Sequence, residues 1–164
     1  MASKTFVPDS FTNPSEFYYT NFVSTLNVLE LAKKFNAKVI FFSSYVYGTP
    51  QCLPIKESHP LQSHNPYSQS KIICEKLCEG YASDFNMPIT IFRPFNIYGT
   101  GQNSNFLIPS IISQVKTGIV NLQDSKPKRD FIFVDDIISA IQLAISSARP
   151  CFDIFNLGSG VSHA

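Results

Sequence analysis

The sequence predicts an α/β fold built on a parallel sheet. Residues 38–43 and 88–93 form continuous apolar runs, which are typical of parallel strands buried on both faces. These runs alternate with longer segments whose apolar residues recur at helical spacing, as crossover helices between parallel strands do. With 164 residues, 44% of them hydrophobic and 15% charged, the chain is long enough to bury one core.

The first helix is expected over residues 14–36. Asn13 can cap it, Pro14 suits its first position, and Glu16 places an acid in its first turn. Its apolar stripe consists of Phe22, Leu26, Leu29, Ala32 and Phe35. The strand at 38–43 follows directly.

A loop rich in Pro, Ser and Gln is expected at 44–66, before a helix over about 66–86 and the strand at 88–93. Asp135 and Asp136 suit the first turn of a later helix that ends near 147. The other expected elements are a helix near 106–117, short strands near 119–122 and 131–134, and a third main strand over 151–157.

Charge and hydropathy exclude several functional classes. The 13 basic and 12 acidic residues give a net charge of +1, so no global field favours nucleic acid or an acidic membrane. No apolar run approaches the length of a membrane span, and the first residues lack the apolar core of a secretion signal. We therefore expect a cytoplasmic protein that binds neither nucleic acid nor membrane.

The cysteines and histidines do not indicate a metal site. The four cysteines lie at 52, 74, 78 and 151, and none forms Cys-x-x-Cys. Cys74 and Cys78 share a predicted helix without a nearby histidine, which favours reduced, buried thiols over zinc ligands. His59, His64 and His163 also lack metal-ligand spacing. We expect no metal.

Tyr67 and Lys71 are the most informative pair in the chain. They are four residues apart in the predicted helix 66–86, so they share one face. A nearby ammonium lowers the pKa of a phenol, which could make Tyr67 a general base near neutral pH. The pattern is common by chance, so its context must decide.

That context resembles the extended short-chain dehydrogenase/reductase family, of the NAD-dependent nucleotide-sugar epimerase/dehydratase kind. Five segments carry the resemblance in order along nearly the whole chain. They are Ser43-Ser44-Tyr45-Val46-Tyr47-Gly48, Pro66-Tyr67-Ser68-Gln69-Ser70-Lys71, Arg93-Pro94-Phe95-Asn96-Ile97-Tyr98-Gly99, Arg129-Asp130-Phe131-Ile132-Phe133-Val134-Asp135-Asp136 and Asn156-Leu157-Gly158.

The resemblance implies catalytic roles. Tyr67 would take the proton of a sugar hydroxyl, and Lys71 would lower its pKa and bind the ribose of NAD or NADP. Ser43 matches the serine or threonine that bonds the reacting oxygen. Ser44 is the alternative residue for this role, and the structural alternative is that the serine pair only caps the end of the strand. Asn21 would support the lysine, unless it simply faces solvent.

Ligand-binding residues are implied as well. Arg93 and Pro94 follow the carboxyl end of a strand and would line the nicotinamide pocket. Arg129 would bind the diphosphate through its planar fork, unless it pairs with Asp135 or Asp136. The substrate-binding set expected for a nucleotide sugar is Asn96, Asn105, Phe106, Leu107 and Arg129.

One departure from the family narrows the chemistry. Dehydratases and decarboxylases of this kind carry a glutamate two residues after the catalytic serine or threonine, where this chain has Tyr45. We therefore expect a nucleotide-sugar 4-epimerase, or the catalytic fragment of one. The alternatives are an NADP-dependent 4-keto-sugar reductase, a sugar-nucleotide dehydratase, and a non-catalytic remnant that acts as an interaction module.

The glycine-rich turn of this family is missing. The seven glycines lie at 48, 80, 99, 101, 118, 158 and 160, and none opens a first strand-to-helix turn where a cofactor pyrophosphate would bind. We therefore expect a truncated Rossmann-like, doubly wound parallel sheet with part of a small substrate-binding lobe. The chain alone should bind NAD weakly or not at all, and the strand at 38–43 should leave an open apolar edge.

Residues 1–164 are interpreted as one partial domain. Residues 1–100 would be the C-terminal half of the sheet, 101–150 the lobe elements, and 151–164 the last main strand with the start of a C-terminal region. The resemblance also implies a homodimer, in which helices 14–36 and 66–86 pack against their symmetry mates.

Overall fold

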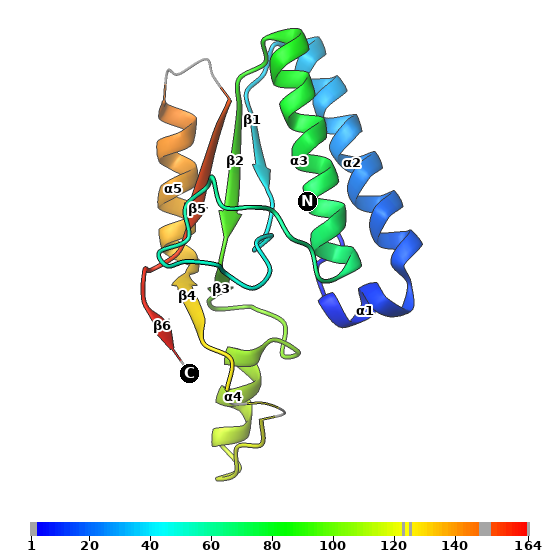
Figure 1. Ribbon diagram of the computed structural model, residues 1–164. Helices are drawn as coiled ribbons and strands as arrows, with labels where there is room; N and C mark the ends of the chain where they lie inside the picture. Colours follow the sequence, from blue (N-terminus) through cyan, green and yellow to red (C-terminus); the bar gives the residue numbers. More distant parts are fainter. Residues whose placement is uncertain (1–2, 123, 125, 148–151, 164) are drawn as a thin grey trace.

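A parallel three-stranded sheet forms the centre of the computed structural model, which describes residues 3–122, 124, 126–147 and 152–163. Its strands are β1 (Val39–Phe42), β2 (Ile89–Pro94) and β5 (Asp153–Leu157), in the order β1-β2-β5 (Figure 1). β2 is buried along its whole length, as expected for a strand flanked on both sides. The α/β class and the parallel sheet are confirmed.

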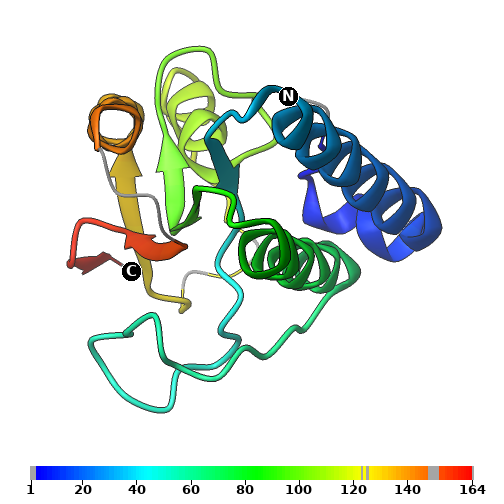
Figure 2. The ribbon, with the colours of Figure 1, turned by 90° about the horizontal axis from the view of Figure 1, so that it is seen from above.

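Two long helices cover one face of this sheet. α2 (Pro14–Phe35) and α3 (Pro66–Phe85) lie side by side, and α5 (Val134–Ser146) lies on the opposite side (Figure 2). Asn36 and Asn86 adopt left-handed conformations with φ of 50° and 52°, which ends α2 and α3. The core between helices and sheet consists of Leu29, Ala32, Val39, Cys78, Met87, Ile89 and Ile91.

A second small sheet lies beyond the carboxyl ends of the main strands (Figure 1). β3 (Asn96–Tyr98) pairs in parallel with β4 (Arg129–Phe133), and β6 (Ser162–His163) pairs antiparallel with β4. α4 (Leu107–Val115) follows β3. A short helix that the sequence pattern did not predict, α1 (Val7–Thr12), precedes α2.

The strand expected near 119–122 does not form. Ile119, Val120 and Leu122 lie in irregular structure and remain 66%, 42% and 44% exposed. No described strand lies beside them, and a strand without a hydrogen-bonded partner is not stable. The predicted strand 151–157 is found as Asp153–Leu157, and Cys151 lies outside the described residues.

β1 is an edge strand among the described residues, as the sequence predicts. The amides of Val39 and Ser43 donate to Pro88 and Phe92 of the β2 segment. Because successive residues of a strand point their backbone groups to opposite sides, those of Ile40 and Phe42 face away from β2. The outward carbonyl of Phe42 accepts a hydrogen bond from Lys71 Nζ at 2.9 Å.

The cysteines fit the prediction of reduced thiols. Cys52, Cys74 and Cys78 are free, and the last two are buried. No group of three or more His, Cys, Asp or Glu side chains in the described part of the chain could hold a metal ion. Within the same residues, no helix combines the length and apolar character needed to cross a membrane.

Cys78 should make the fold sensitive to alkali. Burial, with Cys74 and Glu75 nearby, raises the pKa of its thiol from 9.0 to about 12. A raised folded-state pKa gives stability that is complete below pH 9 and is lost as pH rises toward 12, by about 1.4 kcal/mol per unit at most. Urea denaturation should show this decline, and Cys78→Ala should flatten it. Cys52→Ala, at an exposed thiol, is the control; equal slopes in all three proteins would contradict the assignment.

Candidate active site

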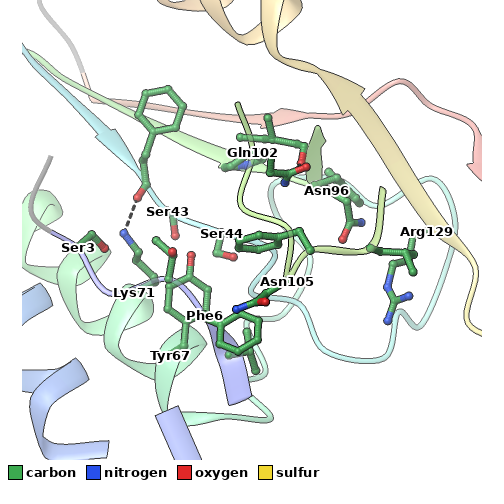
Figure 3. Close-up of a pocket in the computed structure, with 18 of the residues that line it drawn as sticks. Ser3, Phe6, Ser43, Ser44, Tyr67, Lys71, Asn96, Gln102, Asn105 and Arg129 are labelled. Carbon is green, nitrogen blue, oxygen red and sulfur yellow. Dashed lines mark hydrogen bonds between the residues drawn. The ribbon is translucent and has the colours of Figure 1, made fainter. Parts of the chain in front are cut away.

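A cavity of about 1110 Å³ opens where β1 and β2 end (Figure 3). Its walls also include the whole of β1, one side of α2, the beginning of α3, the first turns of the chain and the β3–α4 segment. The carboxyl ends of the strands are the edge at which open α/β sheets bind ligands. The predicted site residues that line it are Asn21, Ser43, Ser44, Tyr67, Lys71, Pro94, Asn96, Asn105, Phe106, Leu107 and Arg129.

Tyr67 and Lys71 point into the cavity from the same face of α3 (Figure 3). Asn65 caps this helix by accepting a hydrogen bond from the Ser68 amide, and Pro66 begins it. The start of the helix is therefore fixed beside the two side chains. Lys71 Nζ lies 6.0 Å from the centroid of the Tyr67 ring, so the predicted juxtaposition is confirmed.

The expected electrostatic effect of Lys71 on Tyr67 is not found. Burial raises the pKa of the Tyr67 phenol above its ordinary value, and a hydrogen bond with Ser44 lowers it in part. Lys71 instead donates to the carbonyl of Phe42 at the end of β1. Burial also lowers the pKa of Lys71 itself, because a desolvated ammonium is less favourable.

The serine pair divides between two environments. Ser44 lies close enough to the Tyr67 phenol to lower its pKa, whereas the sequence favoured Ser43 for the reacting oxygen. Ser43 is 4% exposed and lines the cavity, and its Oγ is buried without a hydrogen-bond partner. A buried hydroxyl in that position is suited to bind a ligand atom. Its backbone amide caps the end of the β1–β2 ladder.

Asn21 is a buried connector, so the solvent-facing alternative is wrong. It is 2% exposed and donates from Nδ2 to Ser70 Oγ at 2.9 Å. Its Oδ1 accepts from the amide of Lys4 at 3.0 Å and from Ser3 Oγ at 3.1 Å. The side chain thus ties the start of the chain to the helix turn that carries Lys71.

Arg93 does not line the cavity, and its predicted cofactor-binding role is corrected. It is 3% exposed and forms a buried ion pair with Glu75, with Nη2 at 2.6 Å from Oε2. Its Nη1 donates to the Tyr47 hydroxyl at 2.9 Å. Neighbouring residues of a strand face opposite sides of the sheet. Pro94 therefore lines the cavity, whereas Arg93 points away from it.

The remaining predicted residues gather at the other end of the cavity (Figure 3). Asn96 donates from Nδ2 to the carbonyl of Asp130 at 2.9 Å. Arg129 is exposed, and the ion pairs among the described residues do not join it to Asp135 or Asp136. Its guanidinium is therefore available to an anionic ligand.

Sequence reasoning missed Gln102, which follows β3 in a glycine-bearing loop. Its Oε1 is buried, has no hydrogen-bond partner and belongs to a residue that lines the cavity. Phe6 was missed as well; its ring stacks edge-on against Phe106 at 5.9 Å. Neither residue carries a sequence signal, since only the folded loops bring them to the cavity.

The cavity fits one end of a nicotinamide cofactor. Lys71 offers a buried donor, and Pro94 and Ser43, whose hydroxyl has no partner, line the same cavity. No glycine lines this cavity in the described part of the chain, whereas a pyrophosphate is usually held by a glycine-rich turn. The residues present therefore match the reacting end of such a cofactor.

The comparisons with known proteins agree with this geometry. Residues 1–158 match the NAD dependent epimerase/dehydratase family. GDP-6-deoxy-D-mannose reductase of Pseudomonas aeruginosa is 33% identical over 98% of this chain and 56% of its own length.

Two of the solved structures that are similar over 99% of this chain illustrate the match. One is UDP-N-acetylglucosamine 4-epimerase from Methanobrevibacter ruminantium, with a TM-score of 0.92, 30% identity and 55% of its chain covered. The other is the dTDP-glucose 4,6-dehydratase DesIV from Streptomyces venezuelae with NAD and TYD bound, with a TM-score of 0.90, 26% identity and 52% of its chain covered. The chain thus spans about half the length of the relatives that it matches.

Proposed function

This chain belongs to the NAD dependent epimerase/dehydratase family, and we propose that it is the catalytic part of a nucleotide-sugar 4-epimerase. The reaction would oxidise the sugar at C4, let the 4-keto sugar turn, and reduce it from the other face. A bound nicotinamide cofactor, NAD or NADP, supplies a reversible hydride acceptor. The observation that carries the proposal is the shared position of Tyr67, Lys71 and Ser43 in one cavity.

Tyr67 is assigned the proton transfer at the sugar hydroxyl. Ser44 lies close enough to lower the pKa of this phenol, so Ser44 can orient the phenolic oxygen while the buried Ser43 hydroxyl bonds the reacting oxygen. We assign Lys71 to binding the ribose of the cofactor. Its buried ammonium donates one hydrogen bond to the carbonyl of Phe42, and an ammonium has further N–H donors for a ligand. Arg129 would hold the diphosphate at the opposite end.

Tyr45 supports epimerisation over dehydration. Dehydration needs an acid to protonate a leaving hydroxyl, and Tyr45 stands where the related dehydratases have one. Its phenol donates to the carbonyl of Gly48 at 2.7 Å, and burial raises its pKa. A phenol held in this way is a poor proton donor to substrate.

A 4-keto-sugar reductase is the second candidate, because GDP-6-deoxy-D-mannose reductase is among the similar relatives. Hydride balance separates the two functions. An epimerase interconverts UDP-glucose and UDP-galactose with catalytic NAD and no added reductant, whereas a reductase consumes NADPH in proportion to product. Two assays test this: chromatography of UDP-glucose and UDP-galactose with NAD, and of a nucleotide-linked 4-keto sugar with NADPH. The epimerase assignment fails if only the 4-keto sugar is converted, with one NADPH oxidised for each alcohol formed.

We also propose a homodimer through α2 and α3. Large apolar side chains remain exposed along the outer faces of these helices, among them Tyr19 at 71%, Leu31 at 58% and Ile73 at 38%. Exposed apolar surface of this extent marks an interaction site. The same surface would serve an interaction module if the chain lacked activity.

A further inference from the structure

Two buried side-chain oxygens in the described part of the chain lack a hydrogen-bond partner, Ser43 Oγ and Gln102 Oε1. Both belong to residues that line the candidate active site. Buried polar atoms of folded proteins are nearly always paired, because an unpaired one destabilises the fold. Ser43 has a role in the proposed reaction, but Gln102 has none.

The orientation of Gln102 is fixed by its own contacts. Its Nε2 donates to the carbonyl of Ile97 in β3 at 2.8 Å, and its backbone amide donates to the carbonyl of Gly99. Only the NH₂ side of an amide can donate to a carbonyl. The side chain must therefore present its oxygen, an acceptor, in the other direction.

An unpaired acceptor oxygen at this place requires a partner that donates a hydrogen bond. Phosphate oxygens are acceptors themselves, so the diphosphate of a nucleotide sugar cannot satisfy Gln102. A sugar or ribose hydroxyl and a base N–H are donors and can satisfy it. Figure 3 shows Gln102 toward Asn96 and away from Lys71, at the substrate end of the cavity.

We propose that Gln102 Oε1 accepts a hydrogen bond from a hydroxyl or N–H group on a neutral part of the nucleotide sugar. The inference rests on the proposed function and adds a specificity-determining residue to it. A ligand that lacks this donor would leave the buried oxygen unpaired, and such ligands are discriminated against strongly.

The test is ligand-observed NMR titration of the 164-residue protein with UDP-glucose, UDP-galactose, GDP-mannose and UDP. Gln102→Met keeps the length of the side chain and removes the acceptor. We expect it to weaken binding of the best nucleotide sugar roughly three- to tenfold, as one net hydrogen bond does. The melting temperature of the unbound variant should change little, because the loss of the hydrogen bond to Ile97 is offset by removal of an unpaired buried oxygen.

Gln114→Met is the matched control. Gln114 lies on α4 outside the cavity lining, and both ends of its amide are paired, with Ser110 Oγ and with the amide of Asn121. This variant should lose stability and keep its affinity. A merely structural Gln102 would behave in the same way, so that pattern in Gln102→Met would overturn the inference.

The other outcomes are also decisive. An equal loss of affinity for UDP and for the sugar nucleotide would place the donor on the nucleotide, and a loss confined to the sugar nucleotide would place it on the sugar; both support the inference. Equal affinity of wild type and Gln102→Met overturns the inference alone. If the wild-type protein binds none of the four probes, the proposed function fails and this inference fails with it.

Discussion

Tyr67→Phe is expected to reduce turnover of a nucleotide sugar by about 10²–10⁴-fold, the usual contribution of a general acid–base group. The substitution removes the phenolic oxygen that would take and return the sugar proton. It keeps the ring, which packs edge-on against Phe17 at 6.4 Å. The phenol has Ser44 as its side-chain partner, so the loss of structure should be small.

The measurement compares kcat of wild type, Tyr67→Phe and Tyr81→Phe, with circular dichroism of each. Tyr81 is a matched control, since its phenol binds Glu30 on the surface and lies outside the cavity. Because burial raises the pKa of Tyr67, the phenolate forms only at higher pH, and wild-type activity should rise on the alkaline side. Substantial activity in Tyr67→Phe would remove the proposed base. If none of the folded proteins is active, the chain is better described as an interaction module.

The order of the long helices and main strands, and the position of the Tyr67/Lys71 pair, could be predicted because they depend on local periodicity. A spacing of four residues places two side chains on one helix face whatever surrounds the helix. The polar partner of each side chain depends on tertiary packing instead. The sequence therefore located Lys71 beside Tyr67 but could not reveal that its ammonium binds the carbonyl of Phe42.

Arg93 and Gln102 show two different limits of sequence reasoning. A motif placed Arg93 at the end of a strand, but strand alternation decides which face each residue occupies. In β2, Pro94 faces the cavity and Arg93 faces the protein interior on the other side of the sheet. No sequence pattern indicates Gln102, because its side-chain oxygen is buried only when the loop after β3 folds.

Arg93→Met is expected to lower the free energy of unfolding by about 3–5 kcal/mol, because it leaves the Glu75 carboxylate buried without its partner. Both side chains of the pair are 4% exposed. Arg93 Nε also contacts both oxygens of Glu75, and Nη1 donates to the carbonyl of Glu57. Urea denaturation followed by circular dichroism measures the loss. Lys76→Met is the control, since Lys76 pairs with Glu79 at the surface and such pairs contribute less than about 1 kcal/mol.

The double variant Glu75→Met/Arg93→Met separates charge burial from packing. Replacing a whole buried ion pair by apolar residues is often neutral or stabilising, because two desolvated charges are removed together. We therefore expect the double variant to be more stable than Arg93→Met, although the contacts of Arg93 with Tyr47 and Glu57 are lost in both. The pair joins β2 to α3 one turn after Lys71, so it also helps to place the helix that carries Lys71. Equal costs for Arg93→Met and Lys76→Met would contradict a buried, partner-dependent charge.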